Sequence, residues 1–385
     1  MVRTLDPRVG GSIEALRQFA PVLVRAGHIV EVATLDKPSA AWLRGFPIPV
    51  HALGPARGRY GYRPGLVPWI RARAPQYDAL VVEGLWQYHG FATWQALHGR
   101  SPYVVFTHGM LDPWFKRRYP LKHVKKWLYW PWAEYRVLRD ATAVLFTCEN
   151  ECERARQSFW LYDCTEVVSN LGTADPAGDP EGQAGEFFAR YPELRGKRLA
   201  LFLSRIHAKK GCDLLVKAFA ETLARDPDWH LVMAGPDQDG WRAKLTVFSE
   251  HAGIANRITW TGMLEGDVKW SAYRAAEMLV LPSHSENFGF VVAEAMACGL
   301  PVLISDKVNI WHEIEQDGAG FVGADTLAGT TDLLRRWVSL DDMNKNAIRQ
   351  RARECFLRRY EIEAAAANRV RTLEGILSGR RAVRK

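Results

Sequence analysis

The sequence contains few cysteines and no long hydrophobic run. Its six cysteines among 385 residues form no C-x-x-C pair, and each lies in or beside an apolar stretch, so we expect reduced, mostly buried thiols. No stretch approaches the roughly 18 apolar residues that a membrane-spanning helix needs, and the first residues lack the apolar core of a signal peptide. These absences predict a cytoplasmic protein that is neither integral to a membrane nor secreted.

The chain also lacks an internal repeat of fixed period, and its only biased tract is the basic tail at 379–385. Hydrophobic residues make up 48% and charged residues 24%, which is typical of a globular protein and excludes collagen-like or disordered classes. A chain of 385 residues is longer than a single hydrophobic core usually supports, so its length predicts two domains. The net charge of +8 favours anionic partners such as phosphates, nucleotides or acidic membrane surfaces.

Short β-branched runs alternate with amphipathic helical stretches along the whole chain. They are nearly continuous in Val, Ile, Leu, Phe and Ala, as is typical of parallel strands covered by helices on both faces. The runs are 29–34, 79–83, 103–107, 143–147 and 166–169, and then 199–203, 230–234, 258–261, 278–282, 301–305 and 320–322. This alternation predicts an α/β fold with two doubly wound, Rossmann-like domains, and a cleft where strand ends of the two domains face each other.

A stretch rich in Gly, Pro and acidic residues at 173–185 has no apolar period and indicates the domain boundary. We predict an N-terminal domain over 1–172, a linker over 173–195, a C-terminal domain over 196–358 and a final helical segment over 359–385.

The most informative segment is 279–305, LVLPSHSENFGFVVAEAMACGLPVLIS. A buried strand is followed by a polar turn, and Phe288-Gly289 opens a helix whose free backbone N–H groups suit a diphosphate. Glu286 in the turn can hold sugar hydroxyls, and the carboxylate of Glu294 in the helix can accept two hydrogen bonds from ribose. The alternative is that Glu286 caps the helix and Glu294 is solvated.

A second segment, 199–211, reads LALFLSRIHAKKG and places Arg205 and Lys210 just after a strand. Arg binds phosphate through its planar fork and Lys as a point charge, so the two could neutralise a leaving diphosphate without a metal. The alternative is a solvated basic loop.

Two features of the first domain also lie at a helix start or after a strand. In LDPRVGGS, Gly10-Gly11 forms a turn before a helix, a start that is compatible with phosphate binding. In VVFTHGML, His108 follows a strand and therefore lies at the predicted cleft edge, although a lone histidine is often structural.

Asp237-Gln238-Asp239 matches a D-x-D pattern that can hold a divalent metal. Its surroundings, AGPDQDG, instead indicate a Gly-rich surface loop, and Arg205 and Lys210 already supply positive charge. We therefore predict no metal.

The segments 199–211, 234–240, 258–264 and 279–305 occur in an order and spacing that resembles the family 4 retaining glycosyltransferases, two-domain enzymes that use sugar nucleotides. The resemblance is densest over about 199–320. It implies the GT-B fold, with two Rossmann-like domains facing a central cleft and a final helix returning to the N-terminal domain. One departure is that only residues 1–4 precede the glycine turn, where the family has a full strand.

The resemblance also implies roles for individual residues. The implied catalytic residues are Glu286, His108, Arg205 and Lys210. The implied donor-binding residues are Gly10, Gly11, Arg205, Lys210, Met263, Leu264, Asn287, Phe288, Gly289, Phe290 and Glu294, with Glu294 on the ribose and Met263-Leu264 against the base.

A Trp-rich region, 114–136, interleaves aromatic rings with seven Lys or Arg residues. Such a segment suits interfacial contact with an anionic membrane. A nucleic-acid patch and aromatics packed into the domain core are the alternatives.

Together these features predict a metal-independent, retaining glycosyltransferase. It would move a hexose-type sugar from a UDP- or GDP-sugar to a hydroxyl of a glycan or lipid-linked acceptor in cell-surface polysaccharide biosynthesis, in the cytoplasm or at the inner face of its membrane. We expect no nucleic-acid partner. The alternatives are a nucleotide-sugar epimerase of the same architecture and a non-catalytic nucleotide-sugar-binding subunit.

Overall fold

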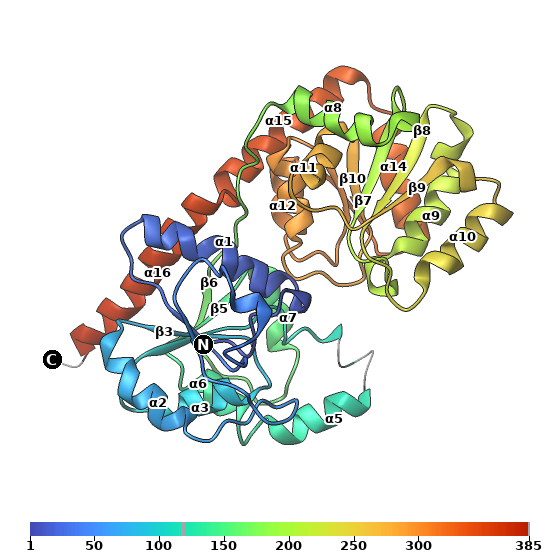
Figure 1. The fold of residues 1–385 in the computed structure, drawn as a ribbon. Helices are drawn as coiled ribbons and strands as arrows, with labels where there is room; N and C mark the ends of the chain where they lie inside the picture. Colours follow the sequence, from blue (N-terminus) through green and yellow to red (C-terminus); the bar gives the residue numbers. More distant parts are fainter. Residues whose placement is uncertain (115, 117–119, 384–385) are drawn as a thin grey trace. The chain divides into compact units, whose positions relative to one another are not determined.

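The structure is a computed structural model that describes residues 1–114, 116 and 120–383. It divides into two compact units: unit 1 comprises Met1–Gly172 with Ile362–Lys385, and unit 2 comprises Thr173–Glu361 (Figure 1). None of the described helices is both long enough and apolar enough to traverse a bilayer.

Unit 1 contains two parallel sheets, β1-β2 and β3-β4-β5-β6. The strands are β1 (Val32–Thr34), β2 (Val50–Ala52), β3 (Leu80–Glu83), β4 (Tyr103–Phe106), β5 (Ala143–Phe146) and β6 (Glu166–Val168). The helices are η1 (Pro7–Val9), α1 (Gly11–Arg25), η2 (Ala41–Leu43), α2 (Leu66–Arg73), η3 (Ala74–Gln76), α3 (Tyr88–Leu97), α5 (Pro120–Tyr129), α6 (Glu134–Arg139), α7 (Glu149–Arg156) and α16 (Ile362–Val383). Five strands lie where the sequence predicts them, and β2 is additional.

The first residues join the two sheets of unit 1. Val2 forms parallel bridges with both Thr34 of β1 and Glu83 of β3. Its backbone N–H donates to the carbonyl of Ala33 at 3.0 Å, and Glu83 donates to Met1 at 2.8 Å. The short segment before the glycine turn therefore contributes a single bridging residue rather than a strand.

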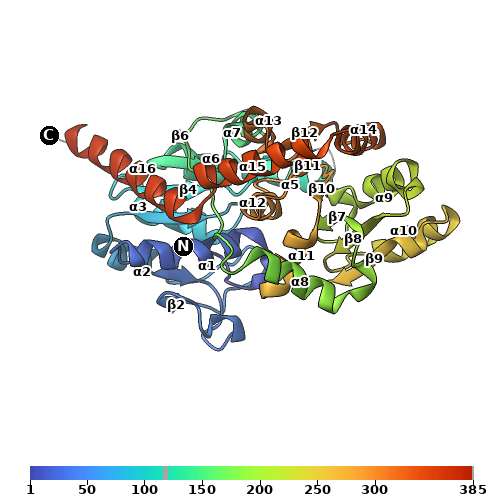
Figure 2. The same ribbon diagram turned by 90° about the horizontal axis from the view of Figure 1, so that it is seen from above.

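Helix α16 packs against α1 in unit 1 (Figure 2). Its Arg369 places the guanidinium 4.2 Å from the ring centre of Phe19 and 4.9 Å from that of Phe106. Arg369 also donates to Ser169 Oγ at 3.2 Å. These contacts explain why the last helix belongs to the first unit, although it follows the second in sequence.

Unit 2 has one six-stranded parallel sheet in the order β12-β11-β10-β7-β8-β9. The strands are β7 (Arg198–Leu203), β8 (Trp229–Ala234), β9 (Ile258–Gly262), β10 (Met278–Leu281), β11 (Val302–Ser305) and β12 (Gly320–Gly323). The helices are α8 (Pro180–Arg190), η4 (Pro192–Leu194), η5 (Ala208–Lys210), α9 (Cys212–Glu221), η6 (Leu223–Arg225), α10 (Trp241–His251), η7 (Ala255–Arg257), α11 (Gly266–Ala275), α12 (Phe290–Ala297), α13 (Trp311–Asp317), α14 (Leu327–Val338) and α15 (Asp342–Arg359). All six strands overlap their predicted positions.

The strand order of unit 2 reverses between β7 and β10, because the chain winds outward from β7 on one side and from β10 on the other. In open α/β sheets, ligands bind outside the carboxyl ends of the strands at this reversal. The loops after β7 and β10 are the two segments that the sequence singles out.

The segment predicted as a linker, 173–195, contains the packed helix α8. Asp179 caps this helix by accepting from the Gly182 N–H at 2.6 Å, and Pro180 occupies its first turn. Phe187 is buried, and α8 packs against α11. The Gly, Pro and acidic residues therefore mark a helix start as well as a connection.

Candidate functional site

Lys210 and Glu286 form an ion pair at the strand-order reversal of unit 2. Lys210 ends η5, in the loop after β7, and only 7% of it is exposed. Glu286 lies in the loop after β10, and its carboxylate oxygen Oε2 accepts a hydrogen bond from the Lys210 ammonium. The structure thus brings together the two motifs, which are 76 residues apart in sequence.

Backbone contacts fix the position of Glu286. Its N–H donates to the carbonyl of Lys307 at 2.9 Å, and its carbonyl accepts from Asn309 at 3.0 Å. Burial raises the pKa of the Glu286 carboxyl, but the Lys210 charge and hydrogen bond outweigh this, and Lys209 and Arg205 add to the lowering. The net pKa lies below its ordinary value, so the side chain is a carboxylate near neutral pH.

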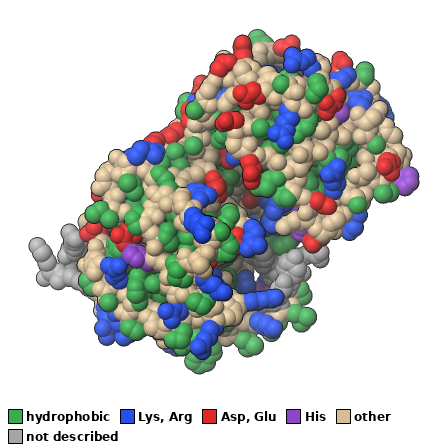
Figure 3. Space-filling model, in the orientation of Figure 1, with side chains coloured by type: hydrophobic (Ala, Val, Ile, Leu, Met, Phe, Trp, Pro, Cys, Tyr) green, Lys and Arg blue, Asp and Glu red, His purple; other side chains and the backbone are tan. Residues whose placement is uncertain are grey.

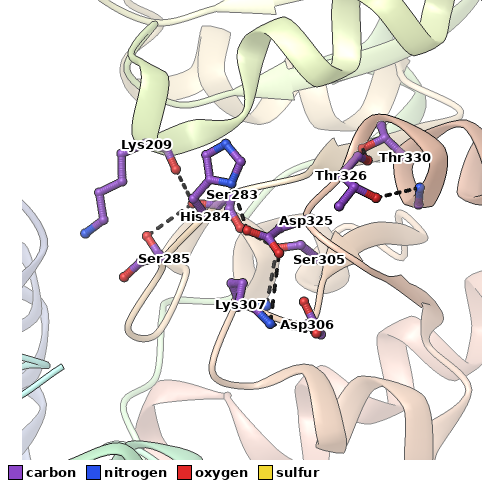
Figure 4. A network of polar contacts seen from close by, with 11 residues as sticks. Lys209, Ser283, His284, Ser285, Ser305, Asp306, Lys307, Asp325, Thr326 and Thr330 are labelled. Carbon is purple, nitrogen blue, oxygen red and sulfur yellow. Dashed lines mark hydrogen bonds and ion pairs between the residues drawn. The ribbon is translucent and has the colours of Figure 1, made fainter. Parts of the chain in front are cut away.

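A polar network ties the two loops together (Figure 4). The carbonyl of Lys209 accepts from the His284 N–H at 2.8 Å and from Ser283 Oγ at 3.0 Å. Ser305 Oγ at the end of β11 donates to the Ser283 carbonyl at 2.5 Å. The His284 ring bonds to Asp325 through Nδ1 at 2.8 Å. The network holds the backbone on either side of the Lys210–Glu286 pair in one geometry.

Helix α12 begins directly after this turn. Its N-cap is Gly289, with φ of 75° and no side-chain capping hydrogen bond, so Glu286 does not cap the helix. The first backbone N–H groups of a helix have no partner within it, and the start of α12 is suited to an anion. Phe288 is buried and packs against Phe290 and Tyr360 at 4.9 and 5.6 Å between ring centres, and its contact with the donor stays a prediction.

Glu294 is buried inside α12, with 4% exposed. Its two carboxylate oxygens accept hydrogen bonds from Lys269 Nζ at 2.7 Å and Tyr273 Oη at 2.8 Å, both from α11. Burial, together with the Glu294 charge, raises the pKa of Tyr273 well above its ordinary value, so the phenol remains a donor. The alternative of a solvated Glu294 is wrong, whereas its contact with a ribose stays a prediction.

The remaining predicted residues of unit 2 lie at the edges of this arrangement. Arg205 is exposed and donates to Gln238 Oε1 at 3.2 Å. Asn287 accepts from Asn309 Nδ2 at 3.3 Å. Met263 is 65% exposed and Leu264 is buried, both after the edge strand β9. In the part of the chain that the structure describes, none of these four side chains forms a hydrogen bond or ion pair with Glu286, and their roles stay predictions.

The predicted residues of unit 1 lie at two separate places, the start of α1 and the end of β4. Gly10, with φ of 99°, caps α1, and Gly11 is its first residue. His108 follows β4, has φ of 49°, and bonds to Glu83 Oε2 through Nε2 at 2.5 Å. Burial raises the pKa of Glu83, but the bond to His108 and the charges of His108 and Arg369 leave it below its ordinary value. This pairing gives His108 a structural partner, and its catalytic role stays a prediction.

The D-x-D pattern forms the turn before α10. Asp237 Oδ1 accepts from the Arg242 N–H at 3.0 Å, and Asp239 has φ of 59° and lies 3.6 Å from the His207 ring. These contacts are typical of a loop that leads into the first turn of a helix. The absence of a metal in the reaction stays a prediction.

The Trp-rich region divides between core and surface. Trp130 is fully buried and stacks on Phe159 at 4.2 Å, whereas Trp132 is 71% exposed. Lys126 lies over the Trp86 ring at 4.4 Å, and burial lowers its pKa to about 8. Residues 115 and 117–119 of this region, and 384–385 of the basic tail, lie outside the described residues. Core packing therefore accounts for part of the region, and a surface of aromatic rings remains.

Sequence reasoning missed the partners of Glu294 and of His284. Lys269 and Tyr273 lie in α11, a helix that carries no motif. Asp325 follows β12 and lies 41 residues after His284, which it contacts. Only the three-dimensional arrangement of the sheet brings these residues to the site.

Comparison with solved structures identifies the same architecture. HepE from Anabaena, in a complex with UDP, superimposes with a TM-score of 0.77 at 18% identity, covering 97% of this chain and 98% of that one. Sucrose-phosphate synthase from Thermosynechococcus elongatus gives a TM-score of 0.74 at 19% identity, covering 96% and 94%. The predicted α/β class with a GT-B fold is confirmed.

Two curated relatives differ in how much of the chain they match. D-inositol 3-phosphate glycosyltransferase from Nocardia farcinica is 31% identical over 49% of this chain, and the chain spans 46% of its length. GDP-mannose:cellobiosyl-diphosphopolyprenol alpha-mannosyltransferase from Xanthomonas campestris is 25% identical over 94% of this chain and 92% of its own.

Two sequence families account for most of both units. The Glycosyl transferase 4-like domain matches residues 10–170, and Glycosyl transferases group 1 matches residues 184–354. The second match contains the Lys210–Glu286 pair and α12. The chain therefore belongs to the group 1 glycosyltransferases of family 4.

Proposed function

We propose that the protein is a metal-independent, retaining glycosyltransferase that moves a hexose-type sugar from a nucleotide diphosphate sugar to a hydroxyl of a glycan or lipid-linked acceptor. The observation that carries the proposal is the buried Lys210–Glu286 pair, in front of α12 at the strand-order reversal. The Xanthomonas mannosyltransferase is named for a GDP-sugar donor and a lipid-linked acceptor, and HepE is described with UDP, which agrees with this class of donor.

In this reaction the bond between the sugar C1 and the diphosphate oxygen breaks, and a C1–O bond to the acceptor forms. Lys210 has three N–H donors and uses one on Glu286, so the others can bond the departing diphosphate. Arg205 and the first N–H groups of α12 add positive potential at the same edge of the sheet. The carboxylate of Glu286 faces the positive charge that develops on the sugar.

The acceptor proton needs a base on the side of the departing group. We assign this role to the leaving phosphate oxygen, which gains negative charge as C1–O breaks and takes the proton from the attacking hydroxyl. Attack from the same face retains the configuration at C1. A role in cell-surface polysaccharide synthesis at the cytoplasmic side of a membrane is part of the proposal.

The first prediction concerns the donor. UDP-, GDP- or ADP-sugars at about 100 times their Kd should stabilise the folded chain by about 2.7 kcal/mol and raise its Tm by roughly 5 °C, because they bind only the folded state. Differential scanning fluorimetry on the full chain checks this, with the nucleoside monophosphates as controls. A chain that none of these nucleotide sugars stabilises would contradict the proposal. Incubation of the selected donor alone, followed by sugar analysis, separates transfer from epimerisation.

Unit 1 carries an exposed apolar surface around α5. Its members are large apolar side chains between 46% and 83% exposed, namely Leu121, Val124, Trp127, Leu128, Trp132 and Trp160. The rings of Trp127 and Trp160 lie 6.4 Å apart, although Trp160 comes from outside the Trp-rich region. Lys116 and Lys125 are exposed in the same part of the chain. Figure 3 shows Lys and Arg side chains next to hydrophobic ones on the face of the molecule in view.

This α5 surface fits an anionic membrane better than a nucleic acid. A nucleic acid is bound through cations and stacking rings and gains nothing from exposed Leu121, Val124 or Leu128. A lipid interface accommodates both the aliphatic side chains and the tryptophans, while lysines contact anionic headgroups. We therefore propose that the protein docks on an anionic lipid surface through α5, where a lipid-linked acceptor would be found.

The second prediction tests this surface. The double variant Trp127→Ser/Leu128→Ser should partition onto phosphatidylcholine–phosphatidylglycerol vesicles about 100-fold more weakly, because two large side chains no longer leave water. Vesicle flotation measures the partition. The matched control is Val247→Ser/Met343→Ser, which removes two exposed apolar side chains from unit 2 and should bind as the unaltered chain does. Equal binding by both variants, or binding that is the same on neutral vesicles, would contradict membrane docking through α5.

A further inference from the structure

A hydrogen-bonded pair of side chains, His284 with Asp325, lies beside Glu286 in unit 2 (Figure 4). His284 precedes Glu286 by two residues in the loop after β10, and its Nδ1 lies 2.8 Å from Asp325 Oδ2. Asp325 lies between β12, the edge strand of the sheet, and α14. Since β11 lies between β10 and β12, the pair joins the loops on either side of β11.

Lys307, in the loop after β11, connects Asp325 to Glu286 by a second route. Its ammonium lies 2.8 Å from Asp306 Oδ2 and 4.0 Å from Asp325 Oδ1. Its carbonyl accepts the Glu286 backbone N–H at 2.9 Å, and Glu286 also forms a parallel bridge with Val308. The Asp325 carboxylate therefore contacts one side chain from each of the two segments that hold the Glu286 backbone.

The pair is placed to act on local geometry more than on global stability. The side chains of His284 and Asp325 are 33% and 27% exposed, so water screens their interaction and it contributes little to the free energy of unfolding. Ser283, the preceding residue, is buried and donates from Oγ to the Lys209 carbonyl at 3.0 Å, which fixes the inner end of the loop. His284 fixes the loop one residue further along, toward Glu286.

We infer that the His284–Asp325 pair positions the Glu286 carboxylate and thereby sets the rate of sugar transfer without binding the donor itself. The inference rests on the proposed function, in which Glu286 faces the positive charge that develops on the sugar. This charge exists only in the transition state, so a displaced carboxylate lowers turnover while the affinity for the donor is kept. Among the described residues, neither side chain of the pair forms a hydrogen bond or ion pair with Lys210, the proposed diphosphate ligand.

The test compares His284→Leu, His284→Asn and Asp325→Ala in the full chain, with the nucleotide sugar that differential scanning fluorimetry selects. Leucine removes the N–H donor, whereas the asparagine side chain carries a nitrogen as many bonds from the backbone as Nδ1 and can bond Asp325 again. His284→Leu and Asp325→Ala should each lower kcat about tenfold, and His284→Asn should stay within about threefold of the unaltered chain. Initial rates of nucleotide release give kcat and KM, and calorimetry with UDP and GDP gives Kd. KM and Kd should change by less than about twofold in all three variants.

Two further measurements separate positioning from support of the fold. In a Glu286→Gln background, His284→Leu should lower kcat by less than about twofold, because the carboxylate through which the pair acts is gone. Exchange of the Glu286 backbone amide with deuterium should be about tenfold faster in His284→Leu and unchanged in His284→Asn. The matched control is His98→Leu, which removes a histidine–aspartate pair of the same kind, that with Asp140 in unit 1, and should alter neither kcat nor this exchange.

Each outcome has a distinct meaning. Normal kcat in His284→Leu and Asp325→Ala, or the same loss of kcat with and without the Glu286 carboxylate, overturns the inference and leaves the proposed function standing. A higher KM and Kd with kcat unchanged also overturns it, because the pair would then bind the donor. If the unaltered chain transfers no sugar from any nucleotide sugar, the proposed function fails. Exchange of the Glu286 amide in His284→Leu then still decides whether the pair positions this residue.

Discussion

Replacement of Lys210 by alanine should lower turnover at saturating donor by about 100- to 1,000-fold, because the departing diphosphate loses a fixed cation that faces it. The same change should cost about 3 kcal/mol of stability, because it leaves the Glu286 carboxylate without its partner in a largely buried position. Steady-state nucleotide release and urea unfolding measure the two effects separately.

The double variant Lys210→Ala/Glu286→Gln tests whether the loss of turnover in Lys210→Ala comes only from its loss of stability. It removes the unpaired charge and should restore most of the lost stability, while turnover stays low. Lys217→Ala is the matched control, since it also removes a lysine from an ion pair in unit 2, the 3.8 Å pair with Asp213 on α9. Normal turnover in Lys210→Ala, or recovery of turnover together with stability in the double variant, would show that Lys210 only supports the fold.

Most strands of the three sheets could be predicted, because buried strands appear in the sequence as apolar runs. Strands such as β4 and β5 are buried at every residue, so they read as unbroken apolar runs. β2 was missed because its three residues, Val50–Ala52, are only partly buried and include a histidine. α8 was missed because few of its side chains reach the core, so its composition resembles that of a linker.

The candidate site could be predicted in outline but not in its contacts. The rule that ligands bind at the carboxyl ends of strands placed Lys210 and Glu286 at one edge of the sheet. It could not show that they pair with each other, because each side chain could equally have faced solvent. For Glu294 the sequence indicated a carboxylate in a helix, whereas its partners Lys269 and Tyr273 come from a helix whose packing only the fold determines.

The approach of the two site loops depends on Gly211, which follows Lys210 and is the N-cap residue of α9. Its φ is 66°, and a Cβ there would overlap the carbonyl oxygen of Pro282 and lie 2.8 Å from the carbonyl carbon. Gly211→Ala should therefore separate the loop after β7 from the loop after β10. The expected result is a loss of several kcal/mol of stability, about 3 or more, since both left-handed strain and backbone overlap are introduced.

Gly240→Ala isolates the first of these causes, the left-handed strain. Gly240 also precedes a helix in unit 2 with a φ of 67°, but a Cβ there would meet nothing within 4 Å. This variant should lose only the conformational part, about 1 kcal/mol, and should keep its affinity for the donor. Gly211→Ala should lose donor affinity as well, because Lys210 and Glu286 sit on the two loops that it forces apart. Equal unfolding midpoints and equal donor Kd values for the two variants would mean that the close approach at Pro282 does not hold the site together.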